Sequence, residues 1–294
     1  MSKLAIVIPY FKIIFFEECL ESLYHQTNQN FTVYIGDDCS PNSPEKIIQK
    51  FNKKLNIHYI KFDTNIGSTD LTQQWSRCID LINNEEWIML LGDDDKLSNN
   101  VIEEFFQAKN DLKDKNVVRC NVTEIDGYNN ILREFNYPKL EKASTSFIKK
   151  ITEDYHISLP EYIFKKDTYK KYGFKSFPFA FGSDEIAWLE FSEGNYIYTL
   201  PTAICYMRLS EFNISGNKQS VKEKVYAKYL TNKYIIANIF NSFNQNEKKI
   251  VIAKGYQYLL FSDSRRIKER IYYILTTFKY LNIKDIKNIF LGIK

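Results

Sequence analysis

The sequence predicts an α/β fold, in which a mostly parallel sheet is flanked by helices and followed by a helical extension. Short apolar runs alternate with segments of helical spacing over the first 130 residues, which is typical of a parallel sheet wrapped by helices. The runs are apolar throughout, as expected of strands buried on both faces. From Lys218 onward helical spacing dominates. With 294 residues, 44% of them apolar and 26% charged, the chain can bury a large core, which excludes a disordered or collagen-like protein.

Strands and helices alternate in order along the first part of the chain. We expect strands at Leu4–Pro9, Thr32–Gly36, Ile57–Phe62, Trp87–Leu91 and Val117–Ile125. Helices are expected at Glu17–Gln26, Ser43–Asn52, Thr69–Asn83 and Asn99–Lys109. At the second helix, Ser43 precedes Pro44, which is typical of a helix that Ser43 caps and Pro44 begins.

The pattern becomes less regular after a turn at Gly127–Asn130. Residues 136–182 are rich in Lys, Tyr, Phe and Pro, and we predict them to be irregular. A loop-rich stretch of that length inside a compact domain usually carries function or is disordered. A helix over Asp184–Glu193 and a strand over Tyr196–Leu200 are expected to follow.

Charge is unevenly distributed along the chain. Residues 1–215 carry 24 Lys and Arg against 31 Asp and Glu, whereas residues 216–294 carry 16 against 5. An acidic body with a basic tail indicates two surfaces that meet different partners, although a solvated charged face on the tail helices explains the tail equally well.

Cysteine, histidine and hydropathy argue against several classes of site. Five cysteines without a C-x-x-C pair indicate neither a disulfide framework nor a zinc site, and they fit a reducing compartment. Three isolated histidines argue against a Ser-His-Asp or histidine–metal enzyme. The apolar run before Pro9 is too short for a signal peptide, and no run approaches the roughly 18 to 20 residues that cross a bilayer. These features favour a cytoplasmic protein.

Acidic residues directly follow two of the predicted strands. Asp37-Asp38 follows the second strand and Asp93-Asp94-Asp95 follows the fourth. Ligands of an open parallel sheet bind at the carboxyl ends of its strands, and neighbouring carboxylates require a compensating cation or donor. Mg²⁺ or Mn²⁺ suits carboxylates without Cys or His, and Mg²⁺ completes its shell with water and phosphate oxygens. The alternative is a solvated acidic helix cap.

The glycine motifs of nucleotide binding are absent, since the chain has neither G-x-G-x-x-G nor G-x-x-x-x-G-K-[ST]. Six other blocks, in order over residues 3–215, resemble those of family 2 glycosyltransferases of the GT-A fold, which is Rossmann-like. These blocks are Ala5-Ile6-Val7-Ile8-Pro9-Tyr10, Cys19 to Thr27, Gly36-Asp37-Asp38-Cys39-Ser40, Asn65-Ile66-Gly67, Trp75-Ser76-Arg77 and Leu91-Gly92-Asp93-Asp94-Asp95.

The resemblance implies a nucleotide site. Pro9 and Tyr10 would line the base pocket and Asp38 would accept hydrogen bonds from the nucleobase, with Asn65 and Gly67 also assigned to the nucleotide.

The resemblance further implies a metal on the donor diphosphate, because Asp93 to Asp95 correspond to the D-x-D element of the family. Members commonly read L-D-x-D-D, and Gly92 stands where the first Asp would fall. Either Asp94 and Asp95 act alone or Asp93 and Asp95 form the pair. We assign Asp94 and Asp95 to Mn²⁺ or Mg²⁺ and Asp93 to the nucleotide.

A general base is implied by Gly182-Ser183-Asp184-Glu185 followed by Trp188-Leu189, which resembles the E-D-x-x-x-W-L block of inverting members. A carboxylate within reach of the acceptor hydroxyl can take its proton as the hydroxyl attacks the sugar. The alternative for Asp184 is a helix N-cap, and one residue could serve both roles. Further on, Ser210 replaces a family histidine that helps to hold the diphosphate, and Arg208 could supply charge there or form a structural ion pair.

The sequence therefore predicts an inverting, metal-dependent glycosyltransferase of the hexosyltransferase class, acting in bacterial surface polysaccharide biosynthesis. It would use a nucleotide sugar, with UDP as the expected carrier, and a saccharide or lipid-linked oligosaccharide as acceptor. The alternatives are a catalytically degenerate nucleotide-sugar-binding module of the same fold and a nucleotidyltransferase. The stretch 136–182, with Tyr155, His156, Tyr162 and Phe177 to Phe181, is expected to shape the acceptor pocket or to form a packed aromatic subdomain.

We expect residues 1–215 to form the GT-A domain, with 1–130 as its nucleotide-sugar half and 131–215 as its acceptor half, and residues 216–294 to form the basic helical extension. Within this extension, residues 265–294 interleave basic and apolar side chains, which predicts either contact with an anionic membrane on its cytoplasmic face or packing against the body. Nucleic acid is not an expected partner.

Overall fold

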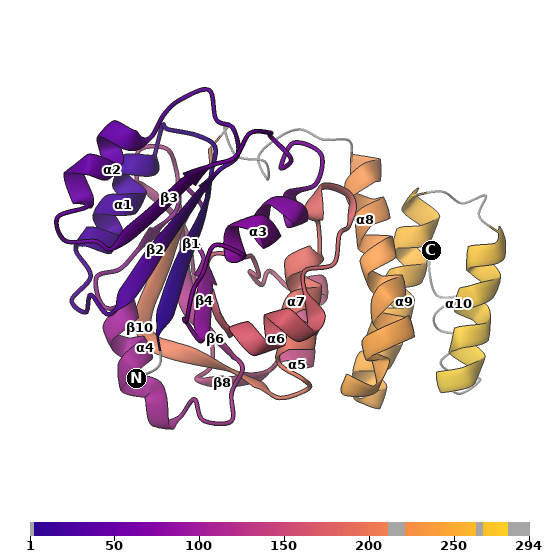
Figure 1. Cartoon of the computed structure of the whole chain (residues 1–294). Coiled ribbons are helices and arrows are strands. Elements are labelled where there is room, and N and C mark those ends of the chain that lie inside the picture. Colours follow the sequence, from indigo (N-terminus) through magenta and orange to yellow (C-terminus); the bar gives the residue numbers. More distant parts are fainter. Residues whose placement is uncertain (1–2, 211–220, 263–266, 282–294) are drawn as a thin grey trace.

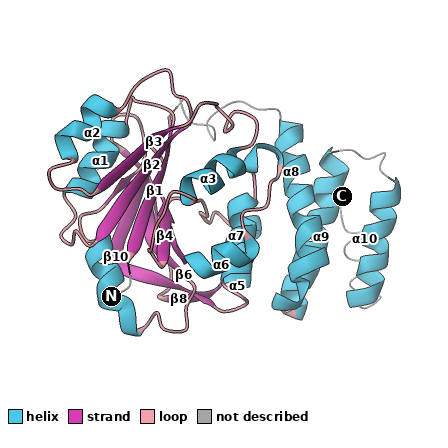
Figure 2. Cartoon of the chain, in the orientation of Figure 1, coloured by secondary structure: helices cyan, strands magenta, loops and turns pink. Residues whose placement is uncertain are grey.

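A mixed sheet with helices on both faces forms the body of the protein, and three further helices lie beside it (Figure 1). The computed structural model describes residues 3–210, 221–262 and 267–281. It confirms the predicted fold class, a mostly parallel central sheet flanked by helices with C-terminal helices added (Figure 2).

The strands occur in the spatial order β3-β2-β1-β4-β9-β6-β10-β5, with β7 paired to β6 and β8 paired to β10. Their bounds are β1 Leu4–Tyr10, β2 Phe31–Asp37, β3 Ile57–Lys61, β4 Trp87–Leu90, β5 Lys96–Leu97, β6 Val117–Ile125, β7 Ile131–Phe135, β8 Leu140–Lys142, β9 Tyr162–Lys165 and β10 Tyr196–Arg208. The first four strands run parallel, and β10 runs parallel to β6, whereas β9 is antiparallel to both of its neighbours. The carboxyl ends of β1, β2 and β4 therefore meet at one edge.

Helices cover the two faces of this sheet and continue beyond it. Their bounds are α1 Phe16–Tyr24, α2 Glu45–Phe51, α3 Leu71–Ile79, α4 Val101–Gln107, α5 Ala143–Thr152, α6 Lys166–Tyr172, α7 Ser183–Phe191, α8 Val221–Tyr234, α9 Gln245–Ser262 and α10 Ile267–Tyr280. A π-helical turn, Ile235–Ile239, follows α8.

The core has two parts, one on each face of the sheet. Alternate residues of β1 point to opposite sides, so Ala5 and Val7 belong to the cluster that contains Trp75 of α3. Ile6 belongs to the other cluster, which contains Leu20 of α1. All of these β1 side chains are fully buried, which explains why the strand is apolar at every position.

The prediction of an irregular stretch over residues 136–182 is wrong. This stretch contains β8, α5, β9 and α6. Strand β9 has only four residues but fills the gap between β4 and β6, where Tyr162, Ile163 and Phe164 are fully buried. Elements this short do not repeat a helical or strand period often enough to stand out from a polar, aromatic background.

Several predicted boundaries also differ. Strand β10 runs on to Arg208 instead of ending at Leu200, because a register shift between Thr199 and Ile204 lets it resume its pairing with β6. Helix α2 begins at Glu45 with Pro44 at the N-cap position, so the prediction that Ser43 caps it is wrong. The Ser43 hydroxyl instead accepts a bond of 3.4 Å from the Glu45 N–H.

The C-terminal helices pack through a buried polar junction. The side-chain amide of Asn232 in α8 donates to the Val251 carbonyl of α9 at 2.8 Å, and its oxygen accepts from the Tyr273 hydroxyl of α10 at 3.0 Å. A Cβ at Gly255 would lie 2.0 Å from that amide oxygen, so the glycine is what allows α9 to approach this closely. In the described part of the chain, no helix is both long enough and apolar enough to cross a bilayer.

The predicted boundary between residues 215 and 216 lies outside the described residues, and the division into halves stays a prediction. Arg265, Arg266 and residues 282–294 of the predicted membrane-contact segment also lie outside them.

Candidate active site

A cavity of about 580 Å³ opens at the carboxyl ends of β1 and β4, facing the start of α7. Pro9 lines it from β1, and Asp93, Asp94 and Asp95 line it from the turn after β4. Asp184 lines it from the first turn of α7. Five predicted site residues from three distant parts of the sequence therefore share one hollow, at the sheet edge where ligands of such sheets bind.

The acidic turn after β4 is held by hydrogen bonds to its own carboxylates. One oxygen of Asp93 accepts the backbone N–H groups of Phe11 and Lys12, each at 2.7 Å. One oxygen of Asp95 accepts the Arg208 N–H at 2.9 Å. These bonds fix the turn against the loop after β1 and against the end of β10.

The glycine that departs from the family pattern makes room for two carboxylates. A Cβ at Gly92 would lie 2.5 Å from an oxygen of Asp95 and 2.9 Å from an oxygen of Asp94. Both oxygens thus converge on the space that a side chain at position 92 would fill. Burial and the proximity of Asp94 raise the pKa of Asp93 to about 7, burial raises the pKa of Asp94, and burial with Asp94 raises that of Asp95 well above its usual range.

This arrangement fits a divalent cation bound by two carboxylates. Burial and the proximity of the carboxylates to one another disfavour their ionised forms, and a bound cation would offset both effects. Within the described residues, no group of three or more His, Cys, Asp or Glu side chains is arranged to hold a metal ion. A pair such as Asp94 and Asp95 would rely on phosphate and water oxygens for the remaining ligands, which is how proteins commonly bind Mg²⁺.

Arg208 is a structural clamp in this site, the second of the two roles considered for it. Its side chain is fully buried and pairs with Glu18 of α1 at 2.9 Å. It also donates to the backbone carbonyls of Asp94 and Asp126, each at 3.0 Å. The guanidinium therefore ties the acidic turn to α1 and to the turn between β6 and β7.

Asp184 lies in the first turn of α7 and does not cap it. The N-cap residue is Gly182, and no side chain caps the helix. The N-cap alternative for Asp184 is therefore wrong. Burial, together with the neighbouring carboxylate of Glu185, raises the pKa of Asp184 to about 7, while Lys150 opposes this rise. A carboxyl group with a pKa near neutrality is suited to take a proton at physiological pH.

The remaining predicted nucleotide residues form a second group next to the cavity. Tyr10 is fully buried, and its carbonyl accepts the Asp38 N–H at 3.0 Å. The Asp38 carboxylate accepts the N–H groups of Ile66 and Gly67, each at 2.9 Å, and pairs with Arg77. Tyr10, Asp38 and the 65–67 loop are thus mutual neighbours, although they do not line the cavity, and their role at the nucleobase stays a prediction.

A charged network also lines the cavity, and of its members the sequence analysis named only His156. Arg133 of β7 donates to both oxygens of Glu124 in β6, at 2.5 and 2.9 Å. His156 lies 3.3 Å from Glu124 and 2.9 Å from the Ser158 hydroxyl. All four residues line the cavity. The antiparallel pairing of β6 with β7 places Glu124 opposite Arg133. The turn at Gly127–Asn130 was the sequence signal for this hairpin, and a hairpin prediction there would have paired Glu124 with Arg133.

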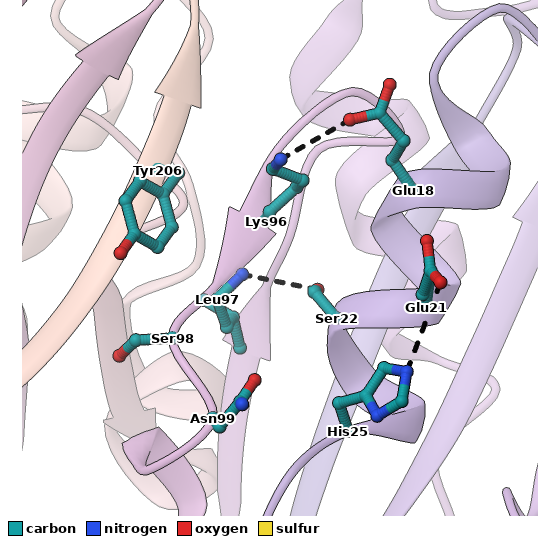
Figure 3. Close-up of a pocket in the computed structure, with 9 residues that line it drawn as sticks. All are labelled: Glu18, Glu21, Ser22, His25, Lys96, Leu97, Ser98, Asn99 and Tyr206. Carbon is teal, nitrogen blue, oxygen red and sulfur yellow. Dashed lines mark hydrogen bonds and ion pairs between the residues drawn. The ribbon is translucent and has the colours of Figure 1, made fainter. Parts of the chain in front are cut away.

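A second hollow, of about 420 Å³, lies between α1 and the segment that contains β5 (Figure 3). Its polar groups bind one another, since Lys96 pairs with Glu18 at 3.3 Å and the Leu97 N–H donates to Ser22 at 3.2 Å. The predicted site residues do not line it, so the larger cavity is the candidate active site.

These features define a class of protein. A GT-A fold with an acidic turn after β4 and a carboxylate at the start of a facing helix is the arrangement of a glycosyltransferase that uses nucleotide sugars. The sequence model of glycosyl transferase family 2 matches residues 5–188, and the chain belongs to this family.

Solved structures of low sequence identity share the fold. TarS 1–349 of S. aureus in complex with UDP-GlcNAc superposes with a TM-score of 0.66 and 16% identity, over 95% of this chain and 80% of that one. Mannosyltransferase PcManGT from Pyrobaculum calidifontis, in complex with GDP-Man and Mn²⁺, superposes with a TM-score of 0.53 and 13% identity, over 99% of this chain and 79% of that one. A search of curated proteins finds no match.

Proposed function

We propose that this glycosyltransferase is inverting and metal-dependent, and that it moves a sugar from a UDP-sugar to a hydroxyl of a saccharide or lipid-linked oligosaccharide in bacterial surface polysaccharide biosynthesis. The observation that carries the proposal is the shared cavity, in which Asp184 faces the acidic turn after β4. In an inverting transfer, the base and the leaving diphosphate act on opposite sides of the sugar, and these two groups of carboxylates suit those tasks.

The proposed donor site joins the two groups of residues described above. Pro9, Tyr10, Asp38, Asn65 and Gly67 are assigned to the nucleoside, which is supported by the contacts of Asp38 with Tyr10 and with the 65–67 loop. Residues 1–130 would then form the nucleotide-sugar half of the domain and residues 131–215 the acceptor half.

Asp94 and Asp95 are assigned as ligands of a divalent cation, and Asp93 is assigned to nucleotide binding. Mn²⁺ or Mg²⁺ at this position supplies positive charge that stabilises the departing diphosphate. The hydrogen bonds of Asp93 to Phe11 and Lys12 support this division of roles, because they occupy Asp93 with the loop after β1.

Asp184 is assigned as the base that takes the proton of the acceptor hydroxyl. Its raised pKa supports this role, since a base works best when its pKa lies near the operating pH. Four aromatic rings that line the same cavity, those of Phe135, Tyr155, Phe179 and Phe181, offer apolar faces on which an acceptor sugar can stack.

UDP is the proposed carrier because TarS, the relative with the higher TM-score, is bound to UDP-GlcNAc, whereas PcManGT is bound to GDP-Man. A thermal-shift panel of UDP- and GDP-sugars with and without Mn²⁺ tests this choice. Ligand at about 100 times its Kd stabilises by about 2.7 kcal/mol, which is a rise of roughly 5 °C for a chain of this size. No shift with any UDP-sugar in the presence of Mn²⁺ would reject the donor assignment.

Matched variants separate the proposed roles. Asp95→Asn keeps an oxygen for the Arg208 N–H, so it should fold and yet lose the Mn²⁺-dependent part of the shift. Asp184→Asn should keep the full shift but lose about 10²- to 10⁴-fold in transfer rate. Asp63→Asn, an exposed substitution, is the control for both. If Asp184→Asn transferred sugar at the wild-type rate, the base assignment would fail.

Two further measurements test the inverting stereochemistry and the alternative of a catalytically degenerate binding module. Proton NMR of the product gives the anomeric configuration, and retention of the donor configuration would overturn the inverting assignment. A degenerate module would bind UDP-sugar without hydrolysing it, so the wild-type chain is expected to release UDP slowly when only water is available as acceptor.

A further inference from the structure

Helix α10 carries its apolar side chains on the face that points to solvent. Ile267, Leu275 and Phe278 are 68%, 62% and 61% exposed, and Ile271 and Ile274 are also exposed. At 100° per residue these five side chains fall within one narrow arc of the helix, which makes a continuous stripe. The stripe defined by these five residues is called the α10 stripe below.

The opposite face of α10 is the one that packs against the body. Tyr273 and Thr277 are fully buried there, and the Tyr273 hydroxyl bonds Asn232 of α8. Glu269 binds Lys233 of α8 at 2.9 Å and accepts a bond from the Tyr229 hydroxyl. Helix α10 is thus fixed in its orientation by polar contacts, and the α10 stripe is left exposed. The helix itself lies beyond α8 and α9, on the side away from the sheet (Figure 1). In its described part, the segment therefore packs on the body through one face, while the five apolar side chains of the α10 stripe stay exposed.

Charge near the α10 stripe is positive. Lys268 and Lys279 are exposed and lie at one border of the stripe. The one carboxylate of the helix, Glu269, is already paired with Lys233. An apolar stripe with basic residues at its border complements a surface that is apolar inside and anionic outside.

We propose that α10 docks the protein on an anionic lipid bilayer, with the α10 stripe in the interface and Lys268 and Lys279 at the lipid headgroups. A second copy of the chain is a poorer partner, because pairing two stripes would bring the lysines of both copies to one interface. Nucleic acid would leave the five apolar side chains without a complementary surface. The proposal does not depend on the proposed function, since lipid binding is measured without any nucleotide sugar.

Vesicle flotation of the full chain tests the proposal. Vesicles of phosphatidylcholine with phosphatidylglycerol at about 7:3 should carry the protein with them, and vesicles of phosphatidylcholine alone should bind it at least ten-fold more weakly. The variant Lys268→Gln/Lys279→Gln should bind anionic vesicles about five-fold more weakly for each lysine removed at low salt. Raising the salt to about 0.5 M should weaken the wild type toward the same level.

The contribution of the α10 stripe to lipid binding is tested by the double variant Ile271→Ser/Phe278→Ser, which should lower binding to anionic vesicles by at least ten-fold. The matched control is Ile131→Ser/Leu132→Ser, because these β7 side chains are also exposed, at 62% and 49%, and lie outside α10. All four substituted positions are exposed, so unchanged far-UV circular dichroism is expected.

Docking is supported if the wild type and the control variant both float with anionic vesicles and if both α10 variants bind these vesicles more weakly. Equal flotation of wild type and Ile271→Ser/Phe278→Ser would overturn it. So would sedimentation velocity in the absence of vesicles that shows a dimer abolished by Phe278→Ser, because the α10 stripe would then be covered by a second copy.

Discussion

Replacing Asp184 with asparagine should stabilise the protein, and the gain should grow as the pH rises from 5 to 8. The pKa of Asp184 is raised from 3.8 to about 7, mainly because the carboxyl group is buried, and next because Glu185 lies beside it. The folded state therefore holds this proton more tightly than the unfolded state does. Stability that the bound proton provides at low pH is lost as the pH rises through the folded pKa.

The size of the effect follows from the shift in pKa. Each pKa unit corresponds to 1.36 kcal/mol, so a rise of about three units sets a ceiling of about 4 kcal/mol between low pH and pH 8. Part of the Asp184 residue is still exposed to water at the cavity wall, and this water reduces the effect, so we expect about 2 kcal/mol. Asparagine has nearly the same shape and never ionises, so the variant should not lose this stability.

Urea unfolding followed by tryptophan fluorescence at pH 5, 6, 7 and 8 measures the difference between variant and wild type. Asp63→Asn is the control, because Asp63 is exposed and its replacement should give no gain that grows with pH. A constant difference between Asp184→Asn and wild type over this range would refute the idea that the protein holds a strained carboxylate at position 184.

Other predictions address the same site. The kcat/KM of the wild type should rise with pH through an apparent pKa near 7, because Asp184 must be ionised to act as a base, and a flat profile from pH 5.5 to 8.5 would count against it. Gly92→Ala should weaken Mn²⁺-dependent UDP binding in calorimetry by about ten-fold or more, because the added Cβ would lie 2.5 Å from an oxygen of Asp95. Arg208→Met should lower the free energy of unfolding in urea by about 2–4 kcal/mol, since it leaves buried carbonyls without donors; a loss under 1 kcal/mol would contradict the clamp. Gly182→Ala should cost about 1–3 kcal/mol in the same assay, because its φ is 85° and its Cβ would meet Thr231.

The sequence predicted the parts of the fold that rest on long, uniform signals. Strand β1 is apolar at nearly every position because both of its faces are covered, and the predicted bounds of β1, β2 and β6 lie within one residue of the observed ones. Strand β9 was missed because four residues are too few to show the alternation of apolar and polar side chains that marks a strand. Its place between β4 and β6 depends on the tertiary structure and cannot be read from the local sequence.

The same contrast holds for the candidate site. Asp93, Asp94, Asp95 and Asp184 were singled out from local blocks, and the fold brings all of them to one cavity. Of the two partners of Glu124, Arg133 could have been found from a local hairpin pattern, but His156 could not, because it comes from a segment that was predicted to be irregular. The orientation of α10 was likewise left open, since an amphipathic pattern shows that two faces differ but does not show which one the body covers.

The contact between Arg208 and Glu18 joins positions 190 residues apart, so the bonds that Arg208 makes to the acidic turn can form only after the last strand of the sheet has been made. A ribosome-bound nascent chain that stops short of β10 would have every proposed ligand of the diphosphate and the cation, and even Asp184, but no clamp on the turn that carries them. Full strength of donor binding should therefore appear late in synthesis, once β10 has joined the sheet.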